Sequence, residues 1–174
     1  MVSLKMNKNS LKNIATEVID LEINALKILK KSINKNFDRA VNLIVDCQSK
    51  IILCGVGKSG LIAAKIASTF SSVGSPAFSL SANDCLHGDL GSITKKDVLI
   101  LISNSGKSEE IIPIIKFANR NKIKLIGIVS KKNSFLYKAS DIKILLPEVK
   151  ESGLGVVPTS STSIQLAIGD ALAV

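Results

Sequence analysis

Apolar runs and segments with helical spacing alternate along most of the chain. Five runs are apolar and strand-like, and three of them are continuously apolar, which is typical of parallel strands that are covered on both faces. The strands predicted from these runs are Lys50–Gly55, Ala77–Ser81, Asp97–Ser103, Lys124–Ser130 and Asp141–Pro147.

Helical patterns fill the segments between these runs. Apolar residues at helical spacing predict a long first helix over Leu11–Ile33. Pro113 lies inside a later pattern and predicts a kink or a late start of that helix. Thr162 and Gln165 fit a capping box at the start of the last helix. The other helices are predicted at Phe37–Cys47, Ser59–Val73, Lys107–Asn121 and Ser134–Ala139.

This alternation predicts an α/β fold with a doubly wound, flavodoxin-like parallel sheet of five strands. We expect N-terminal helices over residues 1–48 to pack on an α/β domain at residues 49–174. In such a fold, ligands bind beyond the carboxyl ends of the strands.

Composition narrows the function classes. The 174 residues are about the size of one domain, 46% of them are hydrophobic, and the formal net charge is +9. The basic residues are almost all scattered lysines, and aromatic residues make up only 3%, which disfavours a nucleic-acid binder. A surplus of positive charge favours an anionic small-molecule substrate.

Cysteine usage and hydropathy predict a cytoplasmic protein without a membrane span. Cys47, Cys54 and Cys85 form no Cys-x-x-Cys pair, so we expect reduced thiols in the core and neither a disulfide framework nor a metal site. The N-terminus lacks the apolar segment of a signal peptide, and no apolar run reaches the ~18 residues that a span needs.

The stretch "GVGKSG" after the first strand suggests a nucleotide site at first sight. An ATP-binding phosphate loop needs a glycine at position 52, where this chain has Ile52. Gly55, Gly57 and Gly60 do match the Gly-x-Gly-x-x-Gly of dinucleotide sites, but no acid ends the second strand to hold a ribose. The remaining alternative is structural: the glycines let the helix pack closely on the strand.

Two further strand ends are rich in hydroxyl groups. "SNSGKS" (Ser103–Ser108) follows the third strand, and "PTSSTS" (Pro158–Ser163) opens the last helix. Each segment alone is typical of an ordinary helix cap. Together at one sheet edge they favour a phosphorylated ligand that is held by hydroxyl groups, backbone N–H groups and helix dipoles, without magnesium.

Four motifs in order, "GVGKSG", "HGDLG", "SNSG" followed by Glu110, and "PTSST" with "GDALAV", resemble the sugar isomerase (SIS) domain of arabinose-5-phosphate isomerases. The resemblance covers about residues 14–174. It implies interconversion of D-arabinose 5-phosphate and D-ribulose 5-phosphate for synthesis of the sugar Kdo of lipopolysaccharide or capsule. It further implies no cofactor and a homodimer or homotetramer with sites near subunit interfaces.

The resemblance also implies roles for single residues. The catalytic positions of the family fall on Lys58, Glu110 and Glu151. Its substrate-binding positions fall on Gly57, Ser59, Gly74, Ser75, His87, Ser103, Asn104, Ser105, Ser108, Thr159 and Ser160.

The residue types suit isomerisation through an enediol. A glutamate with a pKa raised towards neutral could move the proton between C1 and C2, and Lys58 could stabilise the enediolate oxygen. His87 could orient or protonate a sugar hydroxyl. The sequence leaves open which glutamate is the base. Another phosphosugar isomerase and a non-catalytic sugar-phosphate sensor are the alternative functions.

This chain departs from the family at three places. The family continues to a His-Pro-Gly-Gly segment, and usually to CBS domains, so from this chain we expect ligand binding with little or no turnover. Ser81 stands where the family often has a histidine, which disfavours an inhibitory zinc site. The loop that contains Glu151 is about one residue shorter than is usual in the family.

Overall fold

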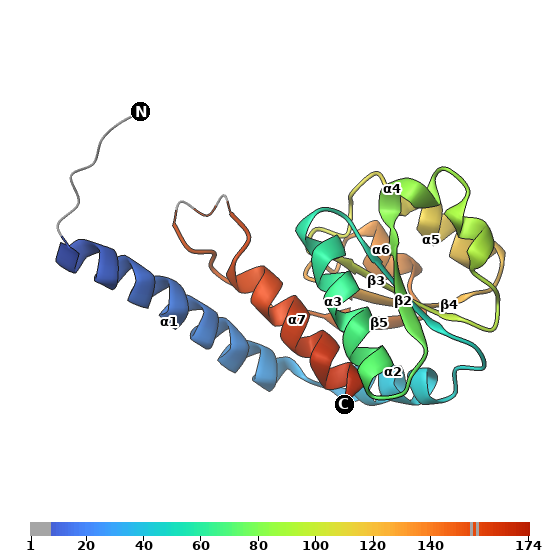
Figure 1. Ribbon diagram of the computed structural model, residues 1–174, viewed down its shortest axis with the longest axis horizontal. Coiled ribbons are helices and arrows are strands. Elements are labelled where there is room, and N and C mark those ends of the chain that lie inside the picture. Colours follow the sequence, from blue (N-terminus) through green and yellow to red (C-terminus); the bar gives the residue numbers. More distant parts are fainter. Residues whose placement is uncertain (1–7, 154, 156) are drawn as a thin grey trace.

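Five parallel strands form the centre of the molecule (Figure 1). The structure is a computed structural model and describes residues 8–153, 155 and 157–174. The strand order β2-β1-β3-β4-β5 is that of a flavodoxin-like doubly wound sheet and confirms the predicted fold class. The strands are β1 (Ile51–Gly55), β2 (Ala77–Ser81), β3 (Val98–Ser103), β4 (Lys124–Val129) and β5 (Ile142–Leu145).

Helices cover both faces of this sheet, which explains why the central strands are apolar on both sides. Ile51 and Leu53 of β1 lie in one core cluster with residues of the first group of helices, and Ile52 and Cys54 lie in a second cluster on the other face. The first group comprises α1 (Lys8–Ser32), α2 (Lys35–Val45), α3 (Lys58–Ser72) and α7 (Ser160–Ala173), and the second comprises α4 (Ala82–Cys85), α5 (Ile111–Arg120) and α6 (Phe135–Ala139).

Two helix starts differ from the sequence-based expectation. α5 begins at Ile111 and not near Lys107, which is the late start that Pro113 predicted as one of two alternatives; Pro113 is its third residue, where a missing N–H is tolerated. α7 begins at Ser160 with Thr159 as N-cap, so the predicted capping box of Thr162 and Gln165 is wrong. The short helix α4 and the 3-10 turn η1 (Asp89–Ser92) were not predicted, because segments this short carry no periodic signal.

Glycines of the "GVGKSG" stretch let α3 approach the end of β1. A Cβ atom on Gly55 would lie 2.7 Å from the backbone carbon of Ser59 and 2.8 Å from its carbonyl oxygen. A Cβ atom on Gly60 would lie 2.9 Å from the carbonyl oxygen of Gly55. Gly57 has a positive φ of 57° where the chain turns into the helix. The structural reading of these glycines therefore holds for the contact between strand and helix.

Gly55→Ala is expected to lower the free energy of unfolding by about 1–3 kcal/mol, because its methyl group would meet backbone atoms that cannot rotate away. For a chain of this size the midpoint of thermal unfolding should fall by roughly 2–10 °C. The matched control is Gly91→Ala, whose Cβ atom would meet no heavy atom within 4 Å. Calorimetry that finds equal melting temperatures for the two variants would contradict this account of the close contact.

Among the described residues, none of the helices combines the length and the apolar character that a membrane crossing requires.

Candidate functional site

Loops at the carboxyl edge of the sheet bring most of the predicted site residues to one side of the molecule. Because all five strands are parallel, the segments that follow β1, β2, β3 and β5 begin at this same edge. These segments contain Gly57, Lys58, Ser59, His87, Ser103, Asn104, Ser105, Ser108, Glu110, Glu151, Thr159 and Ser160.

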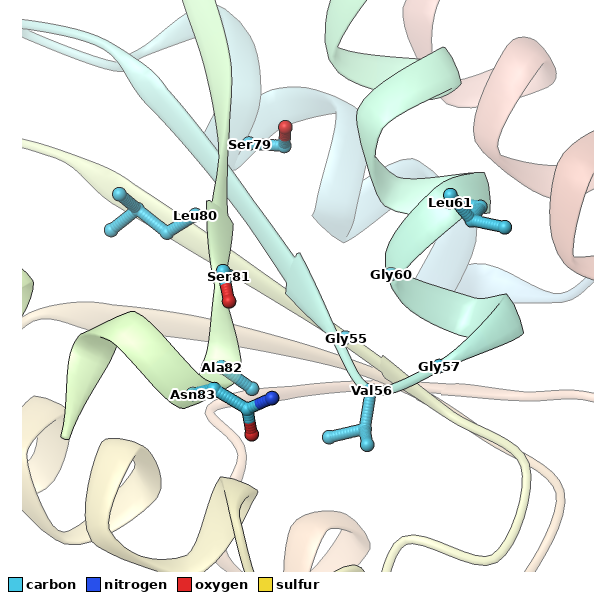
Figure 2. A pocket seen from close by; sticks show the side chains of 10 residues that line it. All are labelled: Gly55, Val56, Gly57, Gly60, Leu61, Ser79, Leu80, Ser81, Ala82 and Asn83. Carbon is cyan, nitrogen blue, oxygen red and sulfur yellow. The ribbon is translucent and has the colours of Figure 1, made fainter.

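A pocket of about 240 Å³ opens between the turn into α3 and the end of β2 (Figure 2). Gly55, Gly57 and Gly60 form its side on β1 and α3, and Ser81 and Asn83 lie opposite them. Lys58, the first residue of α3, is exposed beside this pocket. The glycines thus give a ligand access to the backbone of the turn.

Ser59 ties the start of α3 to α7. Its hydroxyl donates a hydrogen bond of 3.1 Å to Oε1 of Gln165, whose side chain is 1% exposed. Lower on the same helices, Lys65 and Thr69 both donate to the carboxylate of Asp170. The N-termini of α3 and α7 are therefore held beside each other, and with them Lys58 and Ser160.

The segment after β3 is a tight loop and not the first turn of a helix, as the sequence had suggested. The hydroxyl of the buried Ser103 accepts a hydrogen bond of 3.0 Å from the N–H of Gly106. Oδ1 of Asn104 accepts one of 2.7 Å from the hydroxyl of Ser130, in the loop after β4. Ser105 remains exposed and Ser108 is half-buried, so these two hydroxyls are the more available to a ligand.

Glu110 stands at the end of this loop, as the N-cap residue of α5. Its side chain does not cap the helix, and the residue is half-buried. A carboxylate that is neither fully solvated nor committed to a cap remains available for proton transfer.

Glu151 is placed differently. One of its carboxylate oxygens, Oε2, accepts hydrogen bonds from the N–H of Thr159 at 2.8 Å, from the hydroxyl of Thr159 at 3.1 Å and from the N–H of Ser161 at 3.3 Å. Burial alone would raise the pKa of Glu151, but the hydrogen bonds from Ser161 and Thr159 outweigh it and lower the pKa below its ordinary value. The expectation of a pKa raised towards neutral is therefore wrong for Glu151 in this conformation.

Two predictions remain, His87 and the pair Gly74–Ser75, and the structure places them at different edges of the sheet. His87 is exposed in the turn after α4, and within the described ranges its side chain forms no hydrogen bond or ion pair. Gly74 and Ser75 come directly before β2, so they lie at the amino edge of the sheet, in a hollow with Phe70 and the end of α7. Within one chain these two residues lie away from the carboxyl edge, so their predicted place in the substrate site requires a neighbouring subunit to supply them.

Sequence reasoning missed three residues that shape this edge. Gln165 and Ser130 hold the site loops through the bonds described above, and Ser161 donates its N–H to Glu151. All three act across long separations in sequence or through backbone atoms, so spacing alone carries no signal for them.

The side chains at the carboxyl edge suit an anion better than a metal ion. The described part of the chain contains no group of three or more His, Cys, Asp or Glu side chains that could hold a metal ion. The hydroxyl, amide and lysine groups at this edge are instead hydrogen-bond donors, which favour an anionic ligand.

Known proteins resemble this chain over most of its length. A protein of Rickettsia prowazekii, RP505, is 41% identical over 167 residues, which are 96% of this chain and 52% of that protein. The arabinose 5-phosphate isomerase KdsD of Yersinia pestis is 44% identical over 159 residues, 91% of this chain and 48% of the enzyme. The chain thus spans about half the length of these curated relatives.

The fold is shared with solved structures as well. The protein c3406 of Escherichia coli CFT073, determined in complex with arabinose 5-phosphate, is 35% identical and superimposes with a TM-score of 0.92 over 97% of this chain and 90% of that one. These matches confirm the resemblance to arabinose-5-phosphate isomerases. The sequence model of the SIS domain family matches residues 44–174, three quarters of the chain, and the chain therefore belongs to the SIS domain family.

Proposed function

We propose that this chain binds a pentose 5-phosphate and catalyses the aldose–ketose isomerisation of D-arabinose 5-phosphate and D-ribulose 5-phosphate. The observation that carries the proposal is the convergence at one sheet edge of the loop Ser103–Ser108 after β3 (the serine loop), Lys58, Glu110 and the N-terminus of α7. The arabinose 5-phosphate bound to c3406 and the activity named for KdsD support the choice of substrate. In the direction that forms arabinose 5-phosphate, the reaction would supply Kdo synthesis, in the cytoplasm.

The phosphate is proposed to lie between the serine loop and the start of α7. Ser105 and Ser108 offer hydroxyl groups from one side, and Thr159 and Ser160 lie on the other. The hydroxyl of Ser160 is fully buried and has no hydrogen-bond partner within the described residues. An unpaired buried hydroxyl costs about 1–3 kcal/mol, which a ligand oxygen would recover.

The chemistry is an internal redox exchange that needs no external oxidant. Glu110 removes the proton from C2 of the open-chain aldose, and Lys58 stabilises the negative charge that develops on the enediolate oxygen. The proton returns to C1, and the hydroxyl proton moves from O2 to O1, so that the ketose forms. His87 would orient or protonate a hydroxyl from the rim of the site.

Nuclear magnetic resonance in D₂O tests this proposal. Arabinose 5-phosphate incubated with the chain is expected to bind, to acquire deuterium at C2 slowly and to form ribulose 5-phosphate labelled at C1. The low turnover expected from the sequence refers to the complete conversion of aldose to ketose. Exchange of the C2 proton needs only the base Glu110 and Lys58, which stabilises the enediolate oxygen. Binding without any exchange would instead favour the sugar-phosphate sensor, and exchange of a different phosphosugar would favour another isomerase.

A second copy of the chain is the proposed partner of α1. This helix lies along α7 and extends beyond the α/β layers, and it exposes large apolar side chains: Leu11 by 53%, Ile14 by 45% and Ile19 by 58% (Figure 1). Several large apolar side chains exposed on one helix are typical of an interface. Sedimentation is expected to show a homodimer or homotetramer, and Ile14→Glu should weaken it where Lys12→Glu does not; a monomeric wild type would contradict this.

A further inference from the structure

The carboxylate of Glu151 caps the N-terminus of α7, although Glu151 lies eight residues before the N-cap residue Thr159. Thr159, the N-cap residue of α7, forms no side-chain cap with its own helix. The N–H groups of Thr159 and Ser161 instead donate to Glu151, which also accepts a hydrogen bond from the hydroxyl of Thr159. A negative charge at this end of a helix is stabilised by the helix dipole as well as by the hydrogen bonds.

Thr159 extends this contact back into the loop. Its hydroxyl oxygen accepts hydrogen bonds from the N–H of Ser152 at 3.1 Å and from the hydroxyl of Ser152 at 2.9 Å. The side chain of Thr159 is therefore a donor to Glu151 and an acceptor from the next residue of the loop. Both ends of the segment between Glu151 and Thr159 are fixed to each other by these contacts.

Oε2 of Glu151 accepts three hydrogen bonds, and an oxygen in this state is a weak base for removing a proton from carbon. Protonation of Glu151 would give up the charge that the two N–H groups and the hydroxyl stabilise, and its lowered pKa expresses that cost. Glu110 carries no such commitment, because its side chain does not cap α5.

We propose that Glu151 is a positioning residue and not the base: its carboxylate holds Thr159 and Ser160 where they meet the phosphate, and Glu110 alone moves the proton. This inference rests on the proposed function, because it assigns separate tasks to two glutamates of the same site. It predicts that the loss of Glu151 weakens binding of the ligand and spares the chemical step.

The test compares Glu151→Gln with the control Glu148→Gln, an exposed carboxylate after β5 whose partner is Lys131. Calorimetric titration with arabinose 5-phosphate is expected to give a Kd about tenfold higher for Glu151→Gln, the size of effect that follows from a lost cap. The rate of C2 exchange at saturating ligand should stay within about tenfold of wild type. An unchanged Kd with an exchange rate as low as that of Glu110→Gln would overturn the proposal.

The pH dependence of stability gives a readout that needs no ligand. Because the folded-state pKa of Glu151 is depressed, its stabilisation is present above the ordinary value of 4.5 and is lost as the pH falls through the folded-state pKa. Its hydrogen-bond partners within the described ranges are uncharged groups of the loop and of α7, so no neighbouring ion pair is expected to mimic this change.

The melting temperature of Glu151→Gln should therefore lie below that of wild type at pH 7, and the difference should vanish in acid. Carbon-13 resonances of the glutamate carboxyl groups should place the pKa of Glu151 below its ordinary value with and without ligand. Titration near neutral in the complex would identify Glu151 as the base. Failure of wild type to bind arabinose 5-phosphate would instead refute the proposed function, and the two failures are thus distinguishable.

Discussion

Glu110→Gln is expected to reduce deuterium exchange at C2 of arabinose 5-phosphate by about 10²–10⁴-fold, or to the rate of a solution without protein. The amide keeps the size of the side chain and its place at the start of α5, but it cannot accept a proton from carbon. Since Glu110 does not cap the helix, the melting temperature and the Kd for the sugar phosphate should remain close to those of wild type.

The neighbouring carboxylate provides the matched control for this experiment. Glu109 precedes Glu110 in the same loop and is exposed, so Glu109→Gln removes the same charge from almost the same place. It should leave the exchange rate within about twofold of wild type, because screening by water weakens the field of an exposed charge. Equal rates for wild type and Glu110→Gln would remove Glu110 from the proton-transfer step.

Lys58→Ala is expected to lower the same exchange rate by about 10²–10³-fold, the usual effect of removing one group that stabilises an oxyanion. Lys58 is the first residue of α3 and its side chain is exposed, so its truncation should not change the melting temperature. The control is Lys107→Ala, an exposed lysine of the serine loop. If both lysine variants lost only binding affinity, and to the same extent, Lys58 would be a general attractor of the phosphate and not a partner of the enediolate.

The strands and their parallel arrangement could be predicted from sequence because buried parallel strands must be apolar on both faces. Each predicted strand contains the observed one, with ends that differ by at most two residues. The serine loop, Lys58 and Glu110 could be assigned to one edge for the same reason, since parallel strands end together.

Other features depend on contacts that no local pattern encodes. The cap of α7 is supplied by Glu151 across the loop and not by Thr162 and Gln165, whose spacing suggested a capping box. Gln165 points instead to Ser59 on α3. Gly74 and Ser75 were expected in the site from a family resemblance, and only the strand direction shows that they precede β2 at the opposite edge.

The packing of α3 against α7 determines where insertions and deletions can occur without a change in the geometry of the site. Ile66 of α3 packs against Gly169 of α7 so closely that a Cβ atom there would collide with it, and Ser59 is joined to Gln165 near the start of both helices. Helix packing thereby sets the separation between Lys58 and Ser160, and the loop that leads from β5 to α7 need only span it. A loop one residue shorter than its counterparts in the family can therefore serve the same site, and insertions or deletions should accumulate in that loop before they appear at either helix start.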